Sequence, residues 1–227
     1  MKRRGFLLSA LGATGALVVG WGVMPPRARV GSPALWPPTQ GEVALNGWIK
    51  ITPQGDVVLA MPRSEMGQGI FTGLSMLAAE ELDVPMERVR LEPAGHDALY
   101  GNVAMLTAAL PFHPLDSEGP AKPAKVRLGE WMVGKIAREL GINATGGSSS
   151  MADAWDAVRM AAASARAALL NAASLQWQLP LAALQVQAGR VTGPAGQQAH
   201  YTANWWRKRP VCHRGRRSCP RPQRNGA

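Results

Sequence analysis

The chain has 227 residues, of which 46% are hydrophobic and 18% are charged, so it can form a buried core and is not globally disordered. Its formal net charge is +10, but residues 42–201 hold all 15 acidic residues and only 12 of the 25 basic ones, which leaves that part at −3. A basic globular surface for nucleic acid is therefore not expected. Both cysteines, Cys212 and Cys219, lie near the C-terminus, so residues 42–201 have neither a disulfide framework nor a thiolate metal site.

Residues 1–24 are predicted to be an export signal. The run Lys2-Arg3-Arg4-Gly5-Phe6-Leu7 precedes an apolar stretch that ends at Met24, which is the order of a basic and then a hydrophobic signal region. The paired arginines followed by x-Phe-Leu resemble the twin-arginine signal of proteins exported in the folded state. The alternative is a transmembrane helix or retained anchor, because the stretch is close to the ~20 residues that span a bilayer. The expected location is the periplasm, or the periplasmic face of the inner membrane. The proline-rich residues 25–41 are predicted to form an extended linker.

Residues 42–201 are predicted to form an α+β domain without internal repeats. Hydrophobic periodicity predicts a hairpin of strands over 45–51 and 57–61, a helix over 72–82, a strand over 89–92, a long ordered loop over 94–125, helices over 127–140 and 153–176, and a second hairpin over 184–187 and 190–192. Trp131 and Trp177 lie on apolar helix faces and are expected in the core. The four histidines are scattered without metal-ligand spacing, so no metal site is predicted.

Two turns rich in glycine and serine each precede a predicted helix: residues 64–69 (Ser-Glu-Met-Gly-Gln-Gly) and residues 145–150 (Thr-Gly-Gly-Ser-Ser-Ser). Glycine lets the backbone approach a ligand closely, and the first turn of a helix offers unpaired N–H groups and the positive end of its dipole. Either turn could therefore hold a phosphate or a heterocycle. Taken singly, each is also typical of an ordinary tight turn or helix cap. Neither is a dinucleotide fingerprint or a Walker loop.

The ordered set of a twin-arginine start, the Glu65-Met66-Gly67-Gln68-Gly69 turn and the 145–150 turn with Trp155 soon after it resembles a known family. It is similar to the large subunits of the xanthine dehydrogenase/aldehyde oxidase molybdenum hydroxylases, in particular the exported branch typified by the isoquinoline 1-oxidoreductase beta subunit. The resemblance covers residues 2–201. It implies an incomplete molybdopterin-binding domain over 42–201, from the N-terminal part of an enzyme that oxidises an N-heteroaromatic compound or aldehyde with water as the oxygen source.

The resemblance also implies site residues and partners. The implied cofactor-binding residues are Gly67, Gln68, Gly69, Gly147, Ser148, Ser149 and Ser150. The implied cofactor is molybdopterin cytosine dinucleotide, with [2Fe-2S] clusters on a separate small subunit and a c-type cytochrome as a further partner. The catalytic glutamate of the family lies near the C-terminus of longer chains, so no catalytic residue is assigned here and no activity of the chain alone is expected.

Residues 202–227 change abruptly to Trp, Arg, Pro and Cys without an acidic residue. Asn204-Trp205-Trp206 must be encoded by AAY-TGG-TGG. In the frame that starts at the third base of each codon, these nucleotides encode Leu-Val. With GC-rich codons elsewhere, that frame would continue as an amphipathic helix that resembles the family at this place. We interpret this tail as the product of a frameshift near codon 201, which sequencing of the genomic DNA would test. The alternative is a genuine basic tail on a small exported or membrane-anchored binding module without enzymatic activity, which predicts a cooperative thermal transition of residues 42–201.

Overall fold

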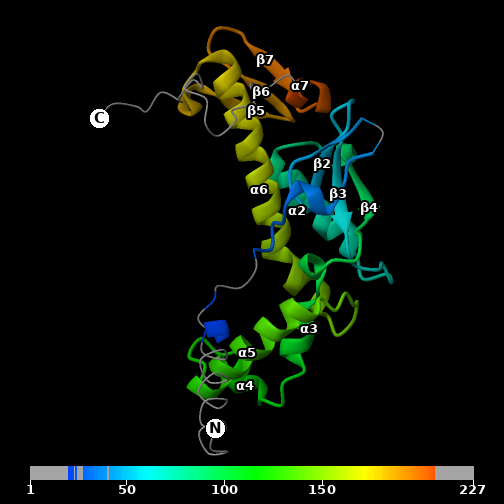
Figure 1. Ribbon diagram of the computed structural model, residues 1–227, viewed down its shortest axis with the longest axis vertical. Helices are drawn as coiled ribbons and strands as arrows, with labels where there is room; N and C mark the ends of the chain where they lie inside the picture. Colours follow the sequence, from blue (N-terminus) through cyan, green and yellow to red (C-terminus); the bar gives the residue numbers. More distant parts are fainter. Residues whose placement is uncertain (1–19, 23, 25–27, 40, 208–227) are drawn as a thin grey trace, which may run out of the picture.

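The structure is a computed structural model that describes residues 20–22, 24, 28–39 and 41–207 (Figure 1). The predicted twin-arginine motif at Arg3 and Arg4, and the tail beyond Arg207, lie outside the described residues. Helix α6 (Ser149–Trp177) runs along most of the molecule, with a sheet and helix α2 beside its middle, short helices at one end and a small second sheet at the other (Figure 1). The mixed helices and sheets confirm the predicted α+β class.

The larger sheet has the strand order β1-β2-β3-β4. Its strands are β1 (Val43–Ala44), β2 (Ile49–Ile51), β3 (Val57–Met61) and β4 (Val89–Pro93). The first three pair antiparallel, whereas β3 and β4 pair parallel in the register Val57↔Val89 to Met61↔Pro93. Parallel neighbours need a crossover connection, and α2 (Ile70–Leu82) provides it. All residues of β2 and β3 are buried, so these two strands form the centre of the core.

Helix α6 packs against α2 and the sheet through small side chains. The buried residues of α6 include Ala154, Ala157, Ala161, Ala162, Ala165 and Ala173. Ala154, Ala157, Ala161 and Ala165 are spaced by three or four residues and so share one helix face, where alanine lets the two helices approach closely. A Cβ atom added at Gly73 of α2 would lie 2.3 Å from the methyl carbon of Met151, so the helices are also close near their N-terminal ends.

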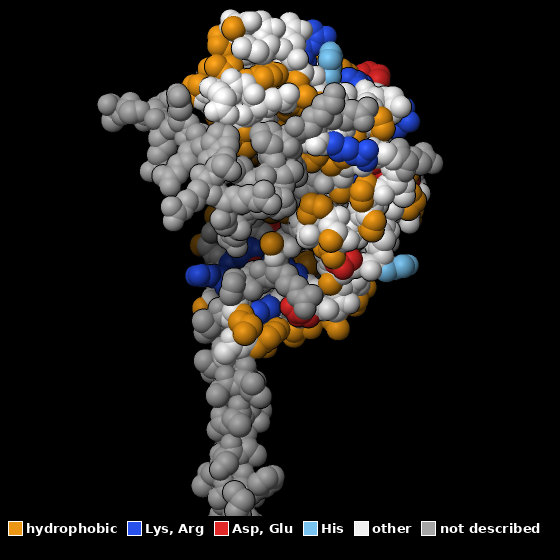
Figure 2. Space-filling model, turned by 45° about the horizontal axis from the view of Figure 1, so that its top comes forward, with side chains coloured by type: hydrophobic (Ala, Val, Ile, Leu, Met, Phe, Trp, Pro, Cys, Tyr) orange, Lys and Arg blue, Asp and Glu red, His pale blue; other side chains and the backbone are white. Residues whose placement is uncertain are grey.

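The region 94–125, predicted as a long loop, contains short helices instead. These are η3 (Ala98–Tyr100), α3 (Val103–Ala108) and α4 (Pro114–Ser117), and α5 (Ala124–Leu140) follows them. The prediction that Trp131 belongs to the core is wrong, because its side chain is 47% exposed on α5 together with the neighbouring Met132 and Ile136. Trp177 is partly buried and packs against the core. Hydrophobic side chains also interrupt the polar surface of the face seen in Figure 2.

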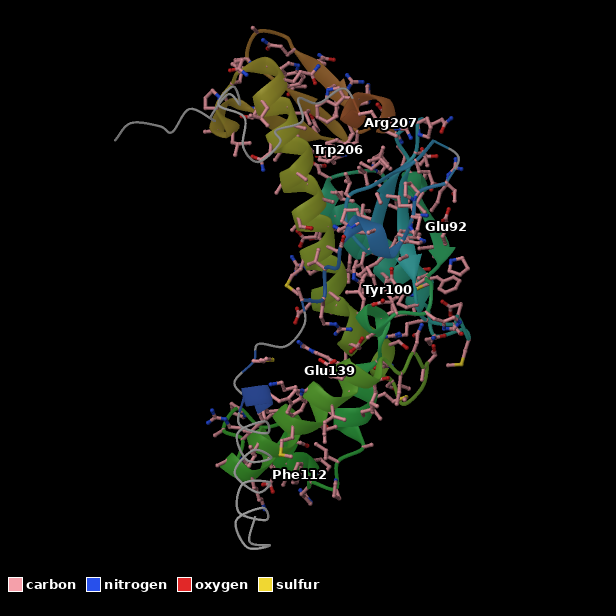
Figure 3. All side chains as sticks on the ribbon, in the orientation of Figure 1. Glu92, Tyr100, Phe112, Glu139, Trp206 and Arg207 are labelled. Atoms are coloured by element: carbon pink, nitrogen blue, oxygen red, sulfur yellow. The ribbon has the colours of Figure 1, made fainter. Side chains whose placement is uncertain are left out.

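The C-terminal part of the described chain forms a three-stranded antiparallel sheet. It consists of η4 (Leu181–Ala183), β5 (Gln185–Gln187), β6 (Arg190–Thr192), β7 (Gln198–His200) and helix α7 (Ala203–Arg207). The Gly189 amide donates to the carbonyl of Asp83 at 2.6 Å, and the Ala203 amide donates to the carbonyl of Thr52 at 3.0 Å. Figure 3 shows Trp206 and Arg207 at the end of the molecule where this sheet meets the larger one. Residues 203–207, which we assigned to the tail, therefore contact the domain.

Residues of the predicted linker also contact the domain. The carbonyl of Arg29 accepts a hydrogen bond from the indole of Trp48 at 2.7 Å. Trp36, which follows η1 (Pro33–Leu35), is buried, and the ammonium of Lys50 lies 3.8 Å from the centre of its ring. None of the helices in the described part of the chain combines the length and apolar character that a membrane span requires.

Candidate functional site

The first glycine turn connects the carboxyl end of β3 to the start of α2. Its glycines have a left-handed backbone, with φ of +87° at Gly67 and +77° at Gly69. A Cβ atom added at either position would meet no atom within 4 Å, so the backbone there faces open space. Glycine is favoured at both positions because side chains rarely adopt this conformation, and the open space leaves room for a ligand beside the turn.

The side chain of Glu65 organises this turn. One carboxylate oxygen accepts the amides of Gly67 and Gly69, each at 2.9 Å, and the other accepts the amide of Phe71 at 3.0 Å. These hydrogen bonds, from Phe71 first and then Gly69, hold the pKa of Glu65 below its usual value. This role of Glu65 was not predicted from the sequence, where the residue was named only as part of the first turn. A possible signal was the absence of Ser, Thr, Asp or Asn just before the helix, which leaves its first amides without a nearby cap.

The side-chain amide of Gln68 is also used within the turn. Its oxygen accepts the amide of Met66 at 2.5 Å, and its nitrogen donates to the carbonyl of Ser64 at 2.8 Å. Because both ends of the amide are occupied, Gln68 holds the shape of the turn. A ligand contact by this side chain would share or replace these bonds.

The second glycine turn leads into the N-terminus of α6. Gly147 and Ser148 both have a left-handed backbone, with φ of +58° and +53°. The hydroxyl of Ser149 donates to the carbonyl of Gly146 at 2.6 Å and accepts from the side chain of Asn102 at 2.8 Å. Ser149 is thus buried and tied to the protein, whereas Ser148 is exposed.

The two turns meet at one cavity of about 380 Å³. It is lined by Met66, Gln68, Gly69, Ile70, Thr145, Gly146, Gly147, Ser148, Ser150 and Met151. A direct contact also joins the turns, because the Ser64 amide donates to the hydroxyl of Thr145 at 2.9 Å. Five of the seven predicted cofactor-binding residues line this cavity, and Gly67 and Ser149 do not. The fold therefore brings together two turns that lie about 80 residues apart in the sequence.

A buried ion pair fixes the spacing between the turns. Arg63, which precedes the first turn, donates to the carboxylate of Asp153, on the first part of α6, at 2.7 Å. Both side chains are almost completely buried, with exposed fractions of 0% and 1%. Arg29 donates to the same carboxylate at 2.6 Å. Burial lowers the pKa of Arg63 below its usual value, and the adjacent Asp153 opposes that change by favouring the charged form.

A second cavity, of about 520 Å³, is lined in part by Ser64 and Glu65 of the first turn. It opens at the carboxyl ends of the parallel strands β3 and β4, and Met61, Phe71, Leu91 and Pro93 give it a mostly apolar lining. Glu92 also lines this cavity, and Figure 3 shows it on the outer strand of the sheet. Within residues 20–22, 24, 28–39 and 41–207, no group of three or more His, Cys, Asp or Glu side chains could hold a metal ion.

Comparisons with known proteins identify the family. A family model described as a molybdopterin cofactor-binding domain matches residues 10–109, which include the first turn. The chain is 31% identical over 192 residues to isoquinoline 1-oxidoreductase subunit beta of Brevundimonas diminuta, a match that covers 84% of this chain. This chain matches the molybdopterin-binding part of a molybdenum hydroxylase large subunit. This confirms the resemblance seen in the sequence.

Two further matches cover smaller parts of the chain. It is 33% identical over 107 residues to the membrane-bound aldehyde dehydrogenase [pyrroloquinoline-quinone] of Gluconacetobacter polyoxogenes, which covers 44% of this chain and 13% of that protein. The reconstituted CO dehydrogenase of Oligotropha carboxidovorans aligns with 70% of this chain and 15% of that one, with a TM-score of 0.42 and 19% identity. The match to the isoquinoline 1-oxidoreductase subunit covers 20% of that protein, so this chain spans about a fifth of the relative's length.

Proposed function

We propose that this chain supplies one wall of the molybdopterin site in an exported molybdenum hydroxylase large subunit. The complete protein would oxidise an N-heteroaromatic compound or an aldehyde with water as the oxygen source. The observation that carries the proposal is the cavity of about 380 Å³ shared by the two glycine turns, in a chain whose family binds molybdopterin.

The residues of this cavity fit such a cofactor. At Gly69, Gly146 and Gly147, an added Cβ atom would meet no protein atom within 4 Å, so a planar ring system could approach the backbone directly. Helix α6 has 29 residues and points its N-terminus at the cavity, where the positive end of its dipole favours phosphate oxygens. No acidic residue lies in the first turn of α6, and the next carboxylate along the helix, that of Asp153, is paired with Arg29 and Arg63.

The proposed roles differ between the residues. Gly147, Ser148 and Ser150 would contact the phosphate-bearing part of the cofactor through backbone amides and hydroxyl groups. Gln68 and Gly69 would border the ring system, with Gly67 shaping the turn behind them, and Ser149 would support the second turn through Asn102. When bound, the molybdenum cofactor supplies the oxidising centre, and this chain binds and orients it.

We also propose that the chain is inactive on its own. Glu65 is engaged with the amides of its own turn, and Glu81 pairs with Arg159 at 2.5 Å on the surface of α2. Neither carboxylate is free to remove a proton from a substrate in the shared cavity. The proposal includes molybdopterin cytosine dinucleotide as the cofactor, a small [2Fe-2S] subunit and a c-type cytochrome as electron acceptors, and export by the twin-arginine machinery to the periplasm. Its support is the resemblance of the N-terminal motif and of the two turns to the exported branch of the family.

Two glycine variants test the cofactor site. Gly146 lines the shared cavity and Gly95 does not, yet both have open space at Cβ and neither has a left-handed backbone. We expect the side chain of Gly146→Val to project into the cavity and obstruct a ligand, and Gly95→Val to serve as the matched control. The measurement is the fluorescent oxidised pterin and the cytidine nucleotide released from chains purified from a host that makes the cofactor. The proposal is supported if wild type and Gly95→Val retain the pterin and the nucleotide and Gly146→Val does not. It is contradicted if all three chains retain them equally, or if wild type retains neither.

A further inference from the structure

We propose that the carboxylate of Glu65 takes the place of a bound anion at the N-terminus of α2. It positions the first glycine turn and prevents phosphate from binding to the amides there. The proposal starts from the three amides that this carboxylate accepts, those of Gly67, Gly69 and Phe71, at 2.9 to 3.0 Å. The first amides of a helix are otherwise unpaired and form a natural anion site. In this chain a residue of the turn already occupies that site.

The backbone explains why the cap comes from Glu65. The N-cap residue of α2 is Gly69, which has no side chain and makes no side-chain cap bond, and the first turn of the helix contains no acidic residue. The left-handed backbone at Gly67 and Gly69 folds the turn back on itself. Glu65 therefore reaches amides two, four and six residues further along the chain.

The N-terminus of α6 differs in this respect. Its N-cap residue Ser148 makes no side-chain cap bond, and the amide of Ser149 is paired with the carbonyl of Gly146 at 3.2 Å. Of the two helix N-termini beside the shared cavity, that of α2 is capped by the carboxylate of Glu65, whereas α6 has no acidic residue in its first turn. If the proposed function holds, the first turn therefore contacts an uncharged part of the cofactor, and the phosphate groups lie on the side of α6.

The charged neighbours of Glu65 are engaged elsewhere. Arg63 and Glu92 line the same cavity of about 520 Å³ as Glu65, but Arg63 is bound to Asp153 at 2.7 Å and Glu92 to Lys50 at 3.0 Å. The backbone amides are thus the groups that hold the carboxylate. Because they lower its pKa, the cap is fully formed above the ordinary pKa of a glutamate and is lost as the pH falls through the lowered value.

Amide hydrogen exchange on the full-length chain, followed by NMR without cofactor, tests the proposal. We expect Glu65→Ala to accelerate exchange at Gly67, Gly69 and Phe71 by about tenfold, which corresponds to the loss of one charge-assisted hydrogen bond at each amide. Inorganic sulfate should restore protection of these amides in Glu65→Ala and leave them unchanged in wild type. Glu87→Ala, which removes an exposed carboxylate outside the turn, is the matched control and should behave like wild type.

A pH series separates capping from a general structural effect. Relative to the intrinsic rate at each pH, wild type should lose protection of the three amides as the pH falls through the pKa of Glu65, and Glu65→Gln should show no such step. This comparison also decides the proposal if Glu65→Ala does not fold. Equal exchange in wild type and variants, or sulfate binding to these amides in wild type, would overturn the role of Glu65. Neither result would affect the pterin retention that tests the cofactor site.

Discussion

The carboxylate of Asp153 accepts hydrogen bonds from two arginines that come from different parts of the chain. Arg63 lies two residues after the end of β3, and Arg29 lies in the segment before the first strand. The same carboxylate accepts the amide of Val103 at 2.8 Å, at the start of α3. One side chain thus connects α6 to the sheet, to the N-terminal segment and to a short helix, and it lies three residues beyond the second glycine turn.

Replacement of Asp153 by asparagine should therefore be strongly destabilising. The variant keeps the shape of the side chain but leaves the fully buried guanidinium of Arg63 without its counter-charge. Breaking a buried ion pair by removing one partner costs about 3–5 kcal/mol. Urea unfolding should show this loss in Asp153→Asn and almost none in Asp156→Asn, an exposed position of the same helix. Equal stability of the two variants would contradict the role of Asp153.

The site residues differ in how far the sequence predicts them. Glycine and serine in the two turns are visible because their conformational freedom and hydroxyl groups mark a turn before a helix. The roles of Glu65 and Asp153 are not visible, since a carboxylate in a sequence carries no sign of which distant or folded-back amides it will bind. Arg63 and Asp153 are 90 residues apart, and only the packing of α6 on the sheet brings them together.

At the level of the elements, close packing of α6 depends on its alanine face. Ala161 is fully buried in this helix, and Ala163, two residues further on, is exposed. Ala161→Leu adds three carbon atoms to a filled interface, which costs about 1–3 kcal/mol. Ala163→Leu should change the stability by less than about 0.5 kcal/mol because its side chain lies in solvent. Thermal or urea unfolding of the two variants gives the comparison, and a neutral Ala161→Leu would show that the interface is not tightly packed.

Elements with strong local signals were predicted to within a few residues. Strand β3 and helices α2 and α5 follow the expected apolar periodicity, and Gly141 ends α5 with a left-handed backbone. Helix α3 was missed because it has six residues and is capped by the side chain of Asn102 and by Asp153, which is about 50 residues away. Strand β7, a partner of β6, was missed because it has three residues and a single buried side chain.

At the scale of the whole molecule, the two glycine turns depend on long-range packing to meet. Helix α2 lies against α6, the Arg63–Asp153 pair joins the sheet to α6, and both contacts orient the turns toward one cavity. The sequence alone predicted two turns of the same type but could not place them side by side. The family assignment agrees with their proximity, and the cofactor contacts of each residue stay a prediction.

The most direct test of this arrangement is a set of nuclear Overhauser contacts in the full-length chain. The structure predicts contacts between the Ser64 amide proton and the Thr145 side chain, whose hydroxyl oxygen lies 2.9 Å from the Ser64 nitrogen, and between the Met151 methyl group and Gly73. Observation of both would show that the two turns border a common space in solution. Their absence from a folded chain, with each turn contacting only its own neighbours in sequence, would contradict the shared cavity and the cofactor site proposed from it.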